Sequence, residues 1–160
     1  MLVVSDTSPL NYLVLIGHDG VLASLFGRVL TVPSVVAELG HTRSPERVRA
    51  WAAAPPSWLE IRSPRLVNPS LRLGPGEAEA ISLASEVNAD AVLIDERRGA
   101  QAAAGLGLLV TGTLGVVQLA HEKGLLRLPD AIAALRGTSF RASEGLLAEM
   151  LRRSASPPPR

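Results

Sequence analysis

The feature that most constrains the fold of this chain is a series of short, predominantly apolar runs. Residues 2–5, 29–32, 91–94 and 108–110 form such runs, and residues 58–61 alternate weakly between apolar and polar. Each run is too short for a helix, and a strand that is apolar along its whole length is buried on both faces, as in a parallel sheet. Helical patterns lie between the runs. This alternation predicts an α/β fold, a three-layer sandwich with a central, mostly parallel sheet of four or five strands.

The helices are predicted from amphipathic spacing and from proline, glycine and N-cap signals at their ends. They span residues 9–16, 20–26, 33–39, 44–54, 77–87, 96–104, 113–122, 128–135 and 143–151. The chain has 160 residues, which suits one domain. We therefore expect a single domain over residues 1–153 and a disordered tail over residues 154–160, where three prolines follow one another.

The composition excludes several classes of protein. Apolar residues make up 47% of the chain and charged residues 19%, which is enough to build a core and unlike a disordered chain. The 16 basic residues nearly balance the 15 acidic ones, which excludes a strongly basic protein that coats nucleic acid. The absence of cysteine excludes a disulfide scaffold, a cysteine zinc site and a thiol nucleophile. No signal peptide or membrane span is evident, so we expect a cytoplasmic protein.

Acidic residues directly follow two of the apolar runs. Asp6 comes after residues 2–5, and Asp95 comes after residues 91–94. The carboxyl ends of the strands in an open parallel sheet border the ligand crevice, so both carboxylates are expected to face it. An Asp at such a position is also a common N-cap of the following helix. Taken singly, each residue fits the capping role better.

Two further acids complete a candidate metal site. Glu38 lies near the end of the helix predicted over residues 33–39, and Glu77 lies at the start of the next amphipathic helix. Taken singly, Glu38 suits a solvated helix face, and Glu77 suits a helix N-terminus, where acids are favourable. If they converge with Asp6 and Asp95, the four like charges repel one another. A hard divalent cation such as Mg²⁺ or Mn²⁺ removes that repulsion and activates water for phosphodiester hydrolysis.

The neighbouring acids and the histidines are not expected in this site. Glu79 follows Glu77 by two positions, which places it on another face of the helix. Glu96, the residue after Asp95, is likewise expected to stay outside the site. The three histidines are scattered and lack the spacing of zinc ligands.

Four short motifs, in this order and spacing, resemble those of the PIN-domain nucleases, a family that includes the toxins of VapC-type toxin–antitoxin pairs. They are Asp6-Thr7-Ser8 after the first strand, Val36-Ala37-Glu38-Leu39, Gly76-Glu77-Ala78-Glu79-Ala80-Ile81 and Leu93-Ile94-Asp95. The resemblance covers residues 2–150 and is closest to a prokaryotic PIN subfamily of undefined biological role. That subfamily also carries a later block, here Gly112-Thr113-Leu114-Gly115.

The resemblance implies a metal-dependent endoribonuclease that acts on RNA with Mg²⁺ or Mn²⁺. Asp6, Glu38, Glu77 and Asp95 are then its catalytic and metal-binding acids, and Ser8 lines the site through its hydroxyl. An antitoxin protein is an implied partner if the chain is a VapC-type toxin. A homodimer is implied as well, and the helices within residues 9–26 and 113–122 favour one because little charge is left on any of their faces.

Two other functions were compared with this one. A phosphatase similar to the haloacid dehalogenases needs a second Asp two positions after Asp6, where this chain has Ser8. A non-catalytic PIN-like module that binds RNA or a protein is the main alternative, and carboxylates at all four motif positions favour the nuclease. Local basic clusters suit either phosphate contacts or a solvated helix face, and they comprise Arg43, Arg47, Arg49, Arg97 and Arg98.

Overall fold

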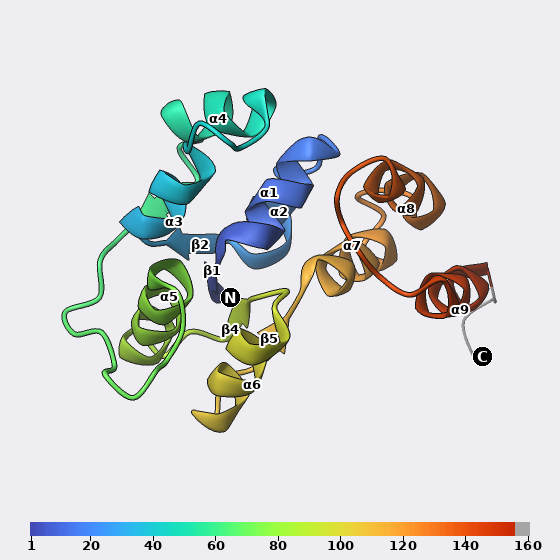
Figure 1. Cartoon of the computed structure of the whole chain (residues 1–160). Coiled ribbons are helices and arrows are strands. Elements are labelled where there is room, and N and C mark those ends of the chain that lie inside the picture. Colours follow the sequence, from blue (N-terminus) through green and yellow to red (C-terminus); the bar gives the residue numbers. More distant parts are fainter. Residues whose placement is uncertain (156–160) are drawn as a thin grey trace.

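A five-stranded parallel sheet lies at the centre of the computed structural model, which describes residues 1–155 (Figure 1). The strands are β1 (Leu2–Ser5), β2 (Arg28–Thr31), β3 (Leu59–Ile61), β4 (Ala91–Leu93) and β5 (Val110–Thr111). Their order in the sheet is β3-β2-β1-β4-β5. The weakly alternating segment forms β3 at one edge of the sheet, where one side is exposed to solvent. The predicted α/β class with a parallel sheet is confirmed.

Helices cover both faces of this sheet. They are α1 (Thr7–Leu15), α2 (Val21–Phe26), α3 (Pro33–Leu39), α4 (Glu46–Ala53), α5 (Pro75–Glu86), α6 (Arg97–Gly105), α7 (Thr113–Glu122), α8 (Leu128–Arg136) and α9 (Glu144–Ala155). The chain moves outward from β1 to β2 and β3, then crosses back to β4 and β5. Right-handed crossovers in these opposite directions place α1 and α2 on one face and α5 and α6 on the other, as Figure 1 shows. The carboxyl ends of β1 and β4, where the direction reverses, are therefore adjacent.

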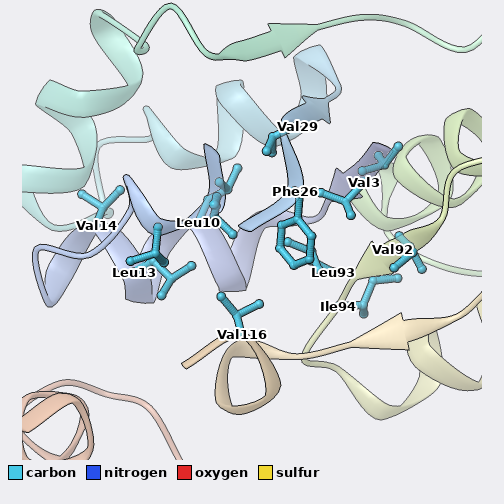
Figure 2. Close-up of a cluster of buried hydrophobic side chains, with 14 of the residues drawn as sticks. Val3, Leu10, Leu13, Val14, Phe26, Val29, Val92, Leu93, Ile94 and Val116 are labelled. Atoms are coloured by element: carbon cyan, nitrogen blue, oxygen red, sulfur yellow. The ribbon is translucent and has the colours of Figure 1, made fainter. Parts of the chain in front are cut away.

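Buried apolar side chains pack on both faces of the sheet, and Figure 2 shows those around α1, α2 and α7. Val3, Val92 and Leu93 from neighbouring strands are fully buried. Leu10 of α1 and Val116 of α7 are also fully buried, in the same cluster. Burial of a side chain of this kind contributes about 1.5–3 kcal/mol to stability. The apolar residues of α1 and α7 therefore pack within one chain, so their low charge does not by itself require a second copy. The homodimer stays a prediction.

Strand β5 begins two residues later than the predicted strand over residues 108–110. The N–H of Leu108 donates to the carbonyl of Ala103, which keeps Leu108 in the C-terminal turn of α6. Gly107 makes the reversal with a φ of +80°, a conformation that glycine adopts without strain. Pairing with β4 then joins Val92 to Val110. The turn geometry of the preceding helix thus sets where this strand begins.

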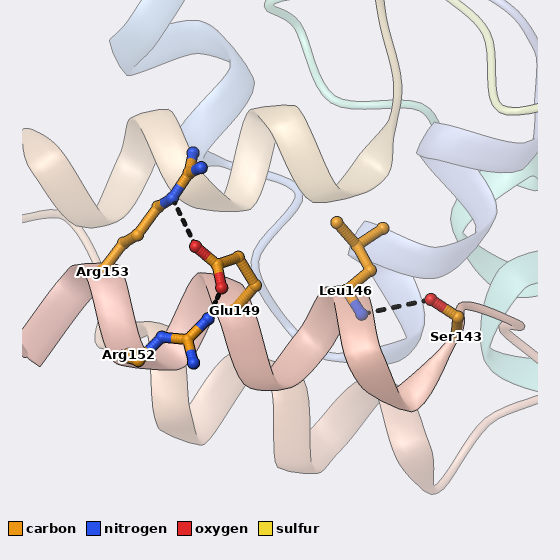
Figure 3. Close-up of polar contacts among 5 residues, drawn as sticks. All are labelled: Ser143, Leu146, Glu149, Arg152 and Arg153. Carbon is orange, nitrogen blue, oxygen red and sulfur yellow. Dashed lines mark hydrogen bonds and ion pairs between the residues drawn. The ribbon is translucent and has the colours of Figure 1, made fainter.

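The last helix extends further than its apolar pattern predicted. Figure 3 shows its polar contacts: Ser143 accepts a 3.1 Å hydrogen bond from the N–H of Leu146 at the helix start, and Glu149 pairs with Arg152 and Arg153. Each such pair stabilises a helix by about 0.3–0.5 kcal/mol, and arginines near the C-terminus complement the helix dipole. α9 therefore reaches Ala155, two residues into the expected tail. The rest of that prediction, residues 156–160, lies outside the described residues.

A search of the described chain for membrane-spanning segments finds no helix with the length and apolar character required.

Candidate active site

Asp6 is held at the carboxyl end of β1, in the turn that begins α1. Its N–H donates a 2.9 Å hydrogen bond to the carbonyl of Leu93, which extends the pairing of β1 with β4 by one residue. The residue is only 5% exposed. Burial raises the pKa of Asp6 to about 6, and the charges of Glu38, Glu96 and Asp95 act in the same direction. A carboxyl group in this environment gains from a nearby cation.

Glu38 reaches the same region from the last turn of α3. Its Oε2 atom accepts a 2.8 Å hydrogen bond from the hydroxyl of Thr7 in the first turn of α1. Gly76 of α5 lies against both acids: a Cβ at this position would lie 3.4 Å from Oε2 of Glu38 and 3.6 Å from Oδ1 of Asp6. The absence of a side chain at Gly76 therefore lets α5 approach the pair closely.

Glu77 enters from the first turn of α5. Its Oε2 atom is buried and has no hydrogen-bond partner in the part of the chain that the structure describes. A Cβ at Gly99 of α6 would lie 3.0 Å from this atom, so the carboxylate is closely packed. Burial is the main cause that raises the pKa of Glu77 to about 8, and Glu96, Asp6 and Glu38 add to it. A buried carboxylate oxygen without a hydrogen-bond partner is costly unless a ligand or a proton compensates it.

These acids line one pocket with a volume of about 280 Å³. The residues around it are Asp6, Thr7, Ser8, Glu38, Gly74, Pro75, Gly76, Glu77 and Glu96. Ser8, which the resemblance implies as a site residue, lines this pocket. The sequence predicts that Glu96 stays outside the site, but Glu96 lines this pocket. It is the residue immediately before α6.

Asp95 faces a different part of the structure. Its carboxylate accepts two hydrogen bonds from Thr113, one from the N–H to Oδ1 and one from the hydroxyl to Oδ2, each 2.6 Å long. Burial raises the pKa of Asp95, and the two bonds from Thr113 oppose that rise. Asp95 lines a neighbouring pocket with residues of α7 and of the segment before α9, among them Leu114 and Phe140. The structure thus brings Asp6, Glu38 and Glu77 together and leaves Asp95 beside α7.

The register of the sheet explains why Glu96 lines the acidic pocket in place of Asp95, the acid predicted there from the sequence. Ser5 of β1 pairs with Leu93 of β4, and paired residues of neighbouring strands point to the same face while successive residues alternate. Asp6 is one residue past this pair and Glu96 is three, so both point one way, whereas Asp95 is two residues past it and points the other way. Glu96 keeps an extended backbone, with φ −72° and ψ 133°. Alternation past the strand end separates Asp95 from Glu96 in the sequence, but only the register shows which of the two faces Asp6.

The comparisons with known proteins agree with this fold. The family model DUF3368, described as a PIN domain, matches residues 2–156. The chain belongs to the PIN domain family. The PIN fold is typical of nucleases.

A solved structure shows the same fold for this PIN domain. It is that of a PilT N-terminus domain protein, SSO1118, from the hyperthermophilic archaeon Sulfolobus solfataricus P2. The match has a TM-score of 0.51 and 15% sequence identity, and covers 89% of this chain and 100% of that one. No curated protein sequence gives a significant match.

The donor chemistry of the PIN-domain pocket fits a hydrated divalent cation. Within residues 1–155, no three acidic or histidine side chains lie close enough together to bind one ion directly. Mg²⁺, however, keeps several of its waters and is commonly held by only one or two carboxylates. Asp6 and Glu38, which both lie against Gly76, supply such a pair. The buried Oε2 of Glu77 supplies a further acceptor without a partner in the described residues.

Proposed function

We propose that this PIN domain is a metal-dependent ribonuclease that hydrolyses phosphodiester bonds of RNA at the acidic pocket. The observation that carries the proposal is the buried Oε2 atom of Glu77, which has no hydrogen-bond partner in the described chain and lies among other acids. An arrangement that raises the pKa of Glu77 to about 8 costs stability in the absence of a cation. Such a cost is typical of a site built for a ligand of opposite charge.

The residues of the pocket have separate roles in this proposal. Asp6 and Glu38 would hold Mg²⁺ or Mn²⁺, and Glu77 and Glu96 would bind it through its waters. The bound ion would supply an activated water and offset the charge that develops on the scissile phosphate. Thr7 orients the carboxylate of Glu38 through its hydrogen bond.

Substrate contacts are proposed for polar groups at the rim. The hydroxyl of Ser8 lines the pocket and is available to donate to a phosphate oxygen. Arg97 and Arg98 begin α6 immediately after Glu96, and both are exposed. Arg98 donates a 3.4 Å hydrogen bond to the carbonyl of Arg72, which lies two residues before pocket-lining Gly74. Exposed arginines at this place suit the backbone of a nucleic acid.

Cleavage assays with the purified chain test the proposal. We expect cleavage of a labelled RNA in Mg²⁺ or Mn²⁺ and none in excess EDTA. Asp6→Asn and Glu77→Gln keep the side-chain shapes and remove a charge, so each should abolish most of the activity. Glu79→Gln is the matched control on the same helix and should leave it intact. RNA binding without cleavage in every metal would instead support the non-catalytic module.

Two narrower proposals rest on the family resemblance. The protein would act as the toxin of a VapC-type pair, restrained by an antitoxin protein, and it would assemble as a homodimer. Expression of the chain alone should then arrest growth of the host cell, while Asp6→Asn should not. Light scattering at micromolar concentration should give twice the mass of the 16.8 kDa chain. A monomer mass would contradict the dimer and leave the nuclease proposal untouched.

A further inference from the structure

We propose that Asp95 is a positioning residue, whose carboxylate fastens the end of β4 to the start of α7 and thereby keeps Glu96 in the acidic pocket. The inference rests on the proposed nuclease function, because it makes Glu96, and not Asp95, one of the acids that bind the metal at that site.

The hydrogen bonds of Asp95 carry this assignment. Both carboxylate oxygens accept from Thr113, Oδ1 from the N–H and Oδ2 from the hydroxyl, at 2.6 Å each. The Thr113 N–H is one of the donors at the start of α7 that have no partner inside the helix. The Thr113 side chain is fully buried, so its hydroxyl needs an internal partner. Asp95 satisfies both groups at once.

Close packing of Gly112 against Asp95 makes this contact specific. A Cβ at Gly112 would lie 2.7 Å from Oδ1 of Asp95, a separation that real side chains do not reach. The backbone of the β5–α7 turn therefore lies directly against the carboxylate. Any larger residue at position 112 would push Asp95 away from Thr113.

Glu96 depends on this anchor because of its place in the chain. It is the residue between Asp95 and the first turn of α6, and alternation directs it to the side opposite Asp95. On that side it lines the pocket and helps to raise the pKa of Glu77. With Asp95 tied to Thr113, the peptide that carries Glu96 has one orientation. The Glu96 carbonyl also accepts a 2.9 Å hydrogen bond from the N–H of Ala100, so without the anchor the segment is held from the α6 side alone.

The replacement Asp95→Asn separates a positioning residue from a metal ligand. Asparagine accepts from the Thr113 N–H through its oxygen and donates to the Thr113 hydroxyl through its amide, so both hydrogen bonds survive while the charge is lost. We expect Asp95→Asn to retain most of the RNA cleavage and the Mn²⁺ affinity measured by calorimetry. Asp95→Ala should lose about 10–100-fold in both, as when a residue that orients a ligand is removed. Thr113→Val should behave like Asp95→Ala, and Thr113→Ser should restore function.

Three results would overturn the assignment or distinguish it from failure of the nuclease proposal. The assignment is wrong if Asp95→Asn folds normally yet loses cleavage and Mn²⁺ affinity as severely as Asp6→Asn. It is equally wrong if a crystal structure of metal-free Asp95→Ala still shows Glu96 lining the pocket, a readout that needs no activity. Failure of the nuclease proposal gives another pattern, in which Asp6→Asn and Glu77→Gln cleave as well as the parent chain.

Discussion

The hydroxyl of Thr7 donates a 2.8 Å hydrogen bond to Oε2 of Glu38, and so links the first turn of α1 to the last turn of α3. Glu38 is exposed at the end of its helix, and this bond restricts the rotamers available to its carboxylate. The pair joins the two sides of the pocket mouth.

Thr7→Val removes this hydroxyl and keeps the shape of the side chain. We expect kcat/KM for RNA cleavage to fall by about 10-fold or more, because Glu38 is no longer held toward Asp6. Thermal stability should change little, since a substitution at an exposed contact shifts the unfolding free energy by about 0.5 kcal/mol or less. Thr7→Ser keeps the donor and should retain activity. Equal activity in the valine variant would show that the bond does not position Glu38.

Stability without metal should fall as the pH rises. The pKa of Asp6 is raised from 3.8 to about 6 and that of Glu77 from 4.5 to about 8. The folded chain then binds more protons than the unfolded chain across this range, so unfolding becomes easier with increasing pH. The contribution of Asp6 and Glu77 to the free energy of unfolding is fully present below about pH 4. It is lost as the pH passes through about 6, for Asp6, and about 8, for Glu77.

Calorimetry in EDTA at several pH values measures this dependence. Tm should decrease between pH 5 and about 8, the range set by the two raised pKa values. Glu77→Gln removes the upper of these two titrations and should therefore make the decrease in Tm above about pH 6 shallower. A Tm that rises over this range in the parent chain would contradict the environment described for Glu77.

Addition of Mn²⁺ should stabilise the folded chain, and more so at pH 8 than at pH 6. A ligand at a hundredfold excess over its Kd stabilises by about 2.7 kcal/mol, which corresponds to a Tm increase of about 5–10 °C for a chain of this length. The increase depends on pH because carboxyl groups must lose their protons to bind the ion. Glu79→Gln should show the full increase and Asp6→Asn a reduced one. The same increase in both variants would place the ion elsewhere.

Two glycines of α6 provide a matched test of the packing around Glu77. A Cβ at Gly99 would lie 3.0 Å from Oε2 of Glu77 and 3.1 Å from Cγ2 of Ile94, whereas a Cβ at Gly105 has no atom within 4 Å outside its surroundings in the helix. Gly99→Ala should destabilise by about 1–3 kcal/mol and reduce cleavage, because Glu77 must move. Gly105→Ala should be neutral or stabilise by up to about 1 kcal/mol, since alanine favours helices. Similar effects in both variants, measured by urea unfolding, would argue against close packing at Glu77.

Much of the architecture could be predicted from local patterns. A short run that is apolar on both faces, such as residues 91–94, is buried as a strand inside a parallel sheet. The amphipathic spacing of apolar residues predicts the helices between these runs. The place of Asp6 at a strand end and of Glu77 at a helix start also favours one edge of the sheet, whereas Glu38, in the last turn of α3, was expected there from the PIN-domain resemblance.

The sequence by itself therefore determined the α/β fold, through its periodicity and the order of its elements, and it indicated three of the acids around the pocket through the motifs shared with PIN domains. Only the tertiary structure decided between Asp95 and Glu96. Both follow β4 directly, and which of them faces Asp6 depends on the pairing of Ser5 with Leu93 across two strands that lie far apart in the chain. A shift of one residue in that register would exchange their directions, because side chains alternate with a period of two.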